Sequence, residues 1–329
     1  MIITLKDTTS SEVASRLVGV REDRGATALG RVLTLIIVVP DSIDVDRAIE
    51  ISDAASREHP CRVVVVVDND DPGAQARLNA QIRVGMDEVG PSDVVILEPH
   101  GDASHDLDTL VMPLILPDTP VVTFWPDHPP ENPGEHPLGE MAARRITDSR
   151  QTACPVRTLV DLARVYADGD TDFAWSAITL WRSVLATVVE EFRTAPRRIR
   201  VTGHPTHPSS FLVAAWLARE TGIETVRETD PEAETITGVH FEFEDATEVA
   251  LTRRAASSVA HLTQTGRETS FINLPRRPIQ DCLMEELRRL DPDLYYARIL
   301  TEDLPRMREV VELVEAPTGS NPTGGGSGE

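Results

Sequence analysis

The feature that most constrains the fold is a series of apolar, β-branched runs separated by helical patterns. VLTLIIVV and CRVVVVVD come first, and DVVILEPH and PVVTFWP follow. Between the first two runs, DSIDVDRAIEISDAASRE repeats apolar residues at helical spacing. Runs that are apolar on both faces are typical of parallel strands with helices on both sides of the sheet. The N-terminal part is therefore predicted to be an α/β fold with a doubly wound, mostly parallel sheet.

Other segments of this part are predicted to be helical or irregular. Asp127 to Gly139 is rich in proline and reads as a long loop. The helical predictions cover Ser10–Val20, Ala74–Val84, Ser104–Leu116, Leu138–Ile146, Thr158–Tyr166 and Asp172–Phe192.

The pattern changes after Pro196. RRIRVTG is predicted to be a strand, and SSFLVAAWLARETG a helix with Ser209 as its N-cap and a terminal glycine. ITGVHFEFE, TEVALTRR, SSVAHLTQT and ETSFINLP alternate with period two, which predicts an antiparallel meander. Ile279–Leu290 is predicted to be a final amphipathic helix. We therefore expect an α/β domain over 1–150, an α+β domain over 151–316 and a disordered tail over 317–329.

Charge excludes several classes of partner. Lys and Arg number 32 and Asp and Glu 54, which gives a net charge of −22. Such acidity disfavours phosphate backbones and anionic membranes, so neither nucleic acid nor membrane is an expected partner. No apolar run reaches the ~18 residues of a membrane-spanning helix. The segment MIITLKDTTSSEV lacks the pattern of a secretory signal, so we expect a cytoplasmic protein.

The cysteines indicate neither zinc nor a disulfide framework. Cys61, Cys154 and Cys282 are the only three, and none belongs to a C-x-x-C pair. Cys154 lies in the polar stretch RQTACPV and is the candidate exposed, redox-active thiol, although an inert small residue is the alternative.

No phosphate-binding loop of the G-x-x-x-x-G-K-[ST] or G-x-G-x-x-G type follows any predicted strand. What does follow a strand is VVVVVDNDD, in which Asp68, Asp70 and Asp71 lie where open α/β sheets bind ligands. This cluster is either a pocket for a divalent metal and a sugar-nucleotide diphosphate or a solvated turn before Pro72 and Gly73. The prolines beside His204 and His207 keep that segment extended, and we predict no metal site there.

The stretch GDTDFAWSAITLWR is predicted to cap and begin a core helix. Asp172 is the expected cap, and Trp181 falls on the apolar stripe. Trp175 and Arg182 are seven residues apart and share a neighbouring face. An aromatic residue beside an arginine is typical of a binding hot spot, so both are candidate partner contacts. The alternative is that Trp175 is a half-buried packing residue.

A local basic pair, Arg144 and Arg145 in AARRITDS, stands out in so acidic a chain. The pair is predicted to hold an anion or an acidic partner surface. The alternative is a solvated helix end whose arginines satisfy the last carbonyls.

Taken together, seven segments resemble one family. ALGRVLTLIIVV, ASREHPCRVVVVV, AQIRVG, LPDTPVVTFWP, RRITDS, GDTDFAWSAITLWR and CLMEELRRLDPD are similar, in this order from about Thr8 to Leu300, to the OpcA family of bacterial glucose-6-phosphate dehydrogenase assembly proteins. The resemblance implies a non-catalytic assembly subunit or allosteric activator of that enzyme. Such a subunit would regulate the oxidative pentose phosphate pathway and NADP metabolism through the enzyme. It supplies no catalytic residues and no cofactor.

Two other functions compete with this one. The first is a metal-dependent enzyme that handles sugars or nucleotides with the Asp68–Asp71 cluster. The second is a binding module that senses a small phosphorylated metabolite through Arg144 and Arg145.

Overall fold

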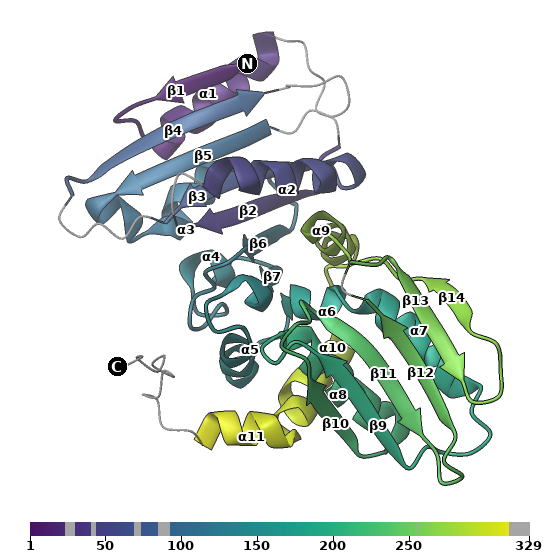
Figure 1. Ribbon diagram of the computed structural model, residues 1–329. Coiled ribbons are helices and arrows are strands. Elements are labelled where there is room, and N and C mark those ends of the chain that lie inside the picture. Colours follow the sequence, from purple (N-terminus) through teal and green to yellow (C-terminus); the bar gives the residue numbers. More distant parts are fainter. Residues whose placement is uncertain (24–29, 41–43, 69–73, 85–92, 255, 316–329) are drawn as a thin grey trace, which may run out of the picture.

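The chain folds around two β-sheets (Figure 1). The computed structural model describes residues 1–23, 30–40, 44–68, 74–84, 93–254 and 256–315. Within these residues no helix is both long enough and apolar enough to cross a membrane. The predicted fold class, a mostly parallel sheet followed by a mainly antiparallel one, is confirmed.

The first sheet has eight strands in the order β1-β4-β5-β3-β2-β6-β7-β8. The strands from β5 to the β8 edge in this order pair in parallel. At the other edge, β4 pairs antiparallel with β5, and β1 pairs antiparallel with β4. The strands are β1 Ile2–Leu5, β2 Leu33–Val39, β3 Cys61–Val67, β4 Arg77–Val84, β5 Asp93–His100, β6 Val121–Trp125, β7 Arg144–Thr147 and β8 Asp170–Asp172. All residues of β2, β3 and β6 are buried, because helices cover both faces.

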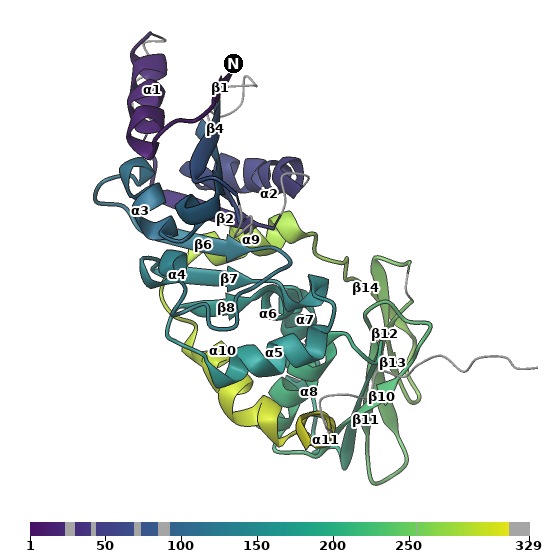
Figure 2. The ribbon, with the colours of Figure 1, turned by 90° about the vertical axis from the view of Figure 1, so that its left-hand side faces the viewer.

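Helices pack on the two faces of this sheet (Figure 2). One face is covered by α1 (Ser10–Asp23), α3 (Leu107–Val111) and the short α4 (Pro137–Glu140). The other is covered by α2 (Val45–Glu58) and by α9 (Ile279–Arg288), which returns from the C-terminal part of the chain. The N-terminal core is therefore completed by a helix that begins more than 200 positions after β2, α2 and β3.

The second sheet has the order β10-β9-β11-β12-β13-β14. β10 pairs parallel to β9, and the rest is antiparallel, which confirms the predicted meander. Its strands are β9 Arg198–Gly203, β10 Thr225–Thr229, β11 Ile236–Glu242, β12 Glu248–Arg253, β13 Val259–Gln264 and β14 Ser270–Asn273. Between the two sheets lie α5 (Pro155–Arg164), α7 (Thr179–Glu190) and α8 (Pro208–Thr221) (Figure 2). They pack in one apolar core with the inner face of this sheet.

Three predicted elements were wrong. Residues 74–84 contain the strand β4 and not a helix, since every second side chain from Leu78 to Val84 is buried against the sheet. Leu138–Ile146 is not one helix, because α4 ends at Glu140 and β7 follows. The segment 172–192 is broken into α6 (Phe173–Ser176) and α7.

The start of one predicted helix and the place of the last helix also differ from the prediction. α8 begins at Pro208 with His207 as its N-cap, so Ser209 is inside the helix, where its hydroxyl donates to the Ala174 carbonyl at 2.9 Å. α9 is not the last helix, because α10 (Leu294–Arg298), a π-helical turn, a 3₁₀ turn and α11 (Arg308–Glu315) follow.

The strands β7 and β8 belong to the first sheet, so the predicted domain boundary at residue 150 falls between two strands of one sheet. The predicted disordered tail, 317–329, lies outside the described residues.

Candidate partner-binding groove

Asp172 fixes the start of the segment from which the candidate site is built. It caps α6, as predicted, and accepts hydrogen bonds from the amides of Ala174 and Ser149 at 2.8 Å. Its carboxylate also accepts from the hydroxyls of Ser149 at 2.8 Å and Thr147 at 2.7 Å. Four donors thus satisfy a carboxylate that is almost completely buried. This network holds β7, β8 and the first turn of α6 together. The predicted core position of Trp181 is confirmed as well.

Trp175 is fully buried, with 2% of its surface exposed. Its indole Nε1 donates to Asp293 at 3.0 Å, and its ring packs against Tyr295 and Tyr296. The guanidinium of Arg182 lies 3.6 Å from the ring centroid, so the predicted pairing of these two residues is real. The alternative interpretation of Trp175 as a packing residue agrees with these contacts, although the side chain is buried and not half-buried, and its role as a partner contact stays a prediction.

Arg144 and Arg145 do not form an exposed basic pair. They lie on β7 with exposures of 4% and 7%. Arg144 is ion-paired with the buried Glu286 and donates to the Asp291 carbonyl at 2.8 Å. Arg145 is ion-paired with Asp170. The premise of a solvated helix end was therefore wrong, because both arginines are buried on a strand and each is paired with a carboxylate inside the fold. Both side chains therefore already have ion-pair partners within the chain.

Three of the four predicted contact residues nevertheless meet at one place. A groove of about 390 Å³ is lined by Arg144, Trp175 and residues of the segment from Glu285 to Tyr295, and Arg182 stacks on Trp175 without lining the groove. We call this hollow the 285–295 groove. Its lining residues come from RRITDS, GDTDFAWSAITLWR and CLMEELRRLDPD, together with Leu294 and Tyr295, and the last segment lies about 100 residues after the second.

The rim of the groove carries an unusual residue. Leu294 begins α10 with 60% of its surface exposed, between the groove residues Asp293 and Tyr295 and two positions before the buried Tyr296. Asp293 caps α10 through the amides of Tyr295 and Tyr296 at 3.0 and 2.9 Å while it holds the Trp175 indole. The exposed leucine is thus presented on a rigid base of aromatic and hydrogen-bonded side chains.

Sequence reasoning missed Glu286, Asp293 and Leu294. One signal was available for Glu286, because it falls on the apolar stripe of α9 beside Leu283 and Leu287. A carboxylate at such a position requires a buried cation, and here the cation is Arg144. The position of Asp293, directly before Leu-Tyr-Tyr, was a signal for a helix cap.

The remaining sequence candidates do not form a second site in the described residues. Asp68 is exposed at the end of β3, and Asp70 and Asp71 lie outside the described residues, so their predicted pocket stays a prediction. Within the described residues no three His, Cys, Asp or Glu side chains form a metal cluster. Cys154 is exposed at the N-cap of α5, as expected, and its redox role stays a prediction.

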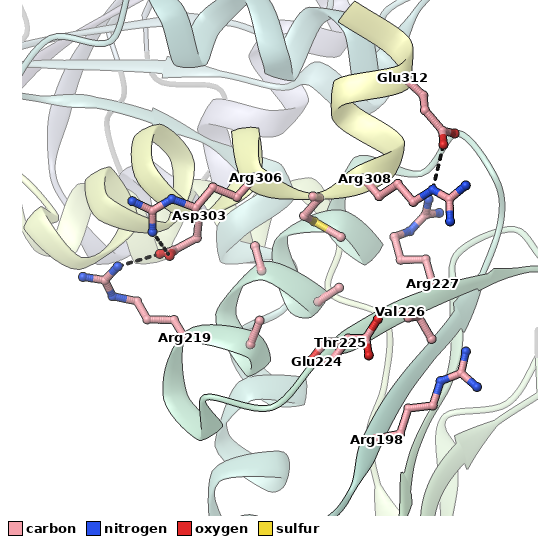
Figure 3. Close-up of a pocket in the computed structure, with 14 residues that line it drawn as sticks. Arg198, Arg219, Glu224, Thr225, Val226, Arg227, Asp303, Arg306, Arg308 and Glu312 are labelled. Atoms are coloured by element: carbon pink, nitrogen blue, oxygen red, sulfur yellow. Dashed lines mark hydrogen bonds and ion pairs between the residues drawn. The ribbon is translucent and has the colours of Figure 1, made fainter.

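A larger hollow of about 840 Å³ lies between α8, β10 and the C-terminal helices (Figure 3). Five arginines line it, but most of them are paired within the chain. Arg219 is ion-paired with Asp303 at 2.8 Å and Arg308 with Glu312 at 2.8 Å. Arg306 lies 3.7 Å from Asp303. These ion pairs already balance much of the positive charge, and the hollow is less suited to an anion than its arginine count indicates.

Comparison with known proteins points to one family. Residues 52–164 match the family model described as "glucose-6-phosphate dehydrogenase subunit N-terminal domain", and residues 168–300 match the corresponding "C-terminal domain". Three segments of the 285–295 groove lie within the matched ranges. A search of curated proteins found no match.

Solved structures share only a distant likeness with the chain. A 3-ketoreductase from Actinomadura kijaniata is 10% identical, with 84% of this chain and 97% of that chain covered and a TM-score of 0.46. A dehydrogenase from Clostridium difficile is 7% identical, with 86% and 98% covered and a TM-score of 0.43. An NAD-binding oxidoreductase from Klebsiella pneumoniae is 10% identical, with the same coverage and a TM-score of 0.43.

Proposed function

The chain belongs to the OpcA family of glucose-6-phosphate dehydrogenase subunits, and we propose that it is a non-catalytic, cytoplasmic subunit that assembles with this enzyme and activates it. The observation that carries the proposal is that the two matched domains together span most of 52–300, which includes the second sheet and six of the eight strands of the first. The proposed activation would regulate the entry of glucose 6-phosphate into the oxidative pentose phosphate pathway.

We further propose that the 285–295 groove is the contact with the enzyme. Three of the segments that resemble the family meet there, although they come from different parts of the chain. The groove presents Leu294 on a base that Trp175 and Asp293 hold in place. An exposed apolar side chain on a rigid base beside a hollow is suited to pack into a pocket of a partner.

Activation requires that the subunit discriminate between states of the enzyme. It raises activity only if it binds the active conformation or assembly more tightly than the others. By linkage, a substrate that favours the same state then tightens the complex. A subunit of this kind needs no catalytic residue of its own.

The test is an assay of glucose-6-phosphate dehydrogenase from the same organism, with and without this chain. NADPH formation gives kcat/KM, and size-exclusion chromatography of the same mixtures gives complex formation. We expect co-elution together with a higher kcat/KM. Separate elution and an unchanged rate would contradict the proposal. Co-elution without a rate change would retain assembly and eliminate activation.

A further inference from the structure

A small cavity between the two sheets has an unusual lining. It measures about 100 Å³, several times the volume that one water molecule requires. It lies where the start of α8 approaches the connection between α6 and α7, the end of β12 and the segment before α9. Among the residues that the structure describes, its lining includes no carboxylate and four arginines, Arg150, Arg253, Arg276 and Arg277. We call it the four-arginine cavity.

Three of these arginines are ion-paired with residues outside the lining. Arg150 binds Asp148 through two hydrogen bonds of 2.6 and 2.8 Å. Arg276 pairs with Glu234, and Arg277 with Glu285. These pairs hold the arginines in place around the cavity, with their carboxylates away from it.

Arg253 differs from the other three. Only 5% of its surface is exposed, yet no carboxylate among the described residues lies within 4 Å of its guanidinium. It donates to the Leu274 carbonyl at 2.7 Å and lies 5.3 Å from the ring centroid of Trp181. Burial, and then the positive charge of Arg276, lower the pKa of the Arg253 guanidinium. Burying a charge without a counter-charge is costly, so an anion in the cavity would stabilise the folded position of Arg253.

The start of α8 adds further anion-binding features. His207, the N-cap, and Ser209, in the first turn, line the cavity. α8 has 14 residues, and the N-terminus of such a helix attracts anions through its free amides and its dipole. The ring Nδ1 of His207 is buried and has no hydrogen-bond partner within the described structure. An acceptor or donor in the cavity would satisfy it.

We propose that the four-arginine cavity binds the phosphate group of a small molecule. Guanidinium forks and helix amides match a tetrahedral oxyanion, and the cavity is too small for more than that group. The phosphate comes from a phosphate ester whose remainder extends out of the cavity or from free inorganic phosphate. The site differs from the pair Arg144 and Arg145, to which the sequence assigned anion binding. It does not depend on the proposed function.

Calorimetric titration of the full chain tests this proposal in phosphate-free buffer. The probes are inorganic phosphate, glucose 6-phosphate and glucose, each at an ionic strength matched with NaCl. We expect phosphate to bind and to raise Tm, and glucose to do neither. Tighter binding of glucose 6-phosphate than of phosphate would identify an ester as the source. Equal or weaker binding would identify free phosphate.

Three variants make the test specific. Arg253→Met should weaken phosphate binding at least tenfold, and Arg276→Gln, at a partly exposed side chain, should weaken it several-fold without risk to folding. Arg306→Gln removes an exposed arginine of the larger hollow and should leave the affinity unchanged. A phosphate effect that NaCl reproduces, glucose binding equal to that of glucose 6-phosphate, or unchanged affinity in Arg276→Gln and Arg253→Met would each overturn the proposal.

Discussion

At the scale of single residues, His207 shows how the positive surroundings of the four-arginine cavity act on a titratable group. Burial, and then the charges of Arg150 and His204, lower the pKa of His207 to about 3. The same imidazole has a pKa of ~6.5 in the unfolded chain. Between these two values the unfolded chain binds a proton that the folded chain does not. The free energy of unfolding therefore falls as the pH falls below 6.5.

Replacement of His207 should remove this dependence on pH. Between pH 6.5 and pH 5 the neutral His207 should lower the free energy of unfolding by about 2 kcal/mol, because each pH unit in this range contributes ~1.36 kcal/mol. Urea unfolding at pH 7, 6 and 5 should show a smaller loss for His207→Gln than for the wild type. His105→Gln, at an exposed histidine, is the control and should behave as the wild type. Equal losses in all three proteins would show that His207 is not neutral in the fold.

The three thiols should react very differently. Cys154 is exposed, whereas Cys61 and Cys282 are buried. Burial raises the pKa of the Cys61 thiol to about 11 and raises that of Cys282 as well, so neither forms the reactive thiolate near neutral pH. A disulfide exchange reagent at pH 8 should modify one thiol per native chain and three after denaturation. Rapid modification of a native Cys154→Ser variant would contradict this assignment.

At the scale of elements, the sequence predicted those strands whose burial is uniform. β2 and β3 are apolar throughout because both faces are covered, and that pattern is visible without tertiary information. β7 was missed because RRIT carries two arginines, and their burial depends on Glu286 and Asp170. β4 was missed because Asn79, Ala80 and Gln81 do not favour a strand, and pairing with β5 overrides this preference.

Two glycines in helices should respond in opposite ways to alanine. A Cβ atom on Gly139 would lie 1.8 Å from the Pro133 carbonyl oxygen, so Gly139→Ala should lower the free energy of unfolding by about 1–3 kcal/mol. A Cβ on Gly19, in α1, meets nothing within 4 Å, and Gly19→Ala should raise it by about 0.5–1 kcal/mol. Urea unfolding measures both. A loss in Gly19→Ala or no loss in Gly139→Ala would contradict the packing described for these helices.

At the scale of the whole molecule, the candidate site depends on contacts between segments that are distant in the sequence, and no local sequence pattern predicts such contacts. α9 crosses back to the first sheet, and the turn after it covers Trp175. The sequence identified Trp175, Arg182 and Arg144 as candidate contacts, and the fold brings them together. It could not indicate that Trp175 is buried, because the residues that contact its ring, Asp293 and Tyr295, are more than 100 positions away.

The central claim is that glucose-6-phosphate dehydrogenase binds at the 285–295 groove. The most direct measurement is a calorimetric titration of the enzyme with three forms of the chain: wild type, Leu294→Asp and Met112→Asp. Met112 is the matched control, with 58% of its surface exposed in the turn after α3, on the first sheet. We predict that Leu294→Asp weakens binding at least tenfold while Met112→Asp binds as the wild type. Equal affinity for the wild type and Leu294→Asp would contradict the claim.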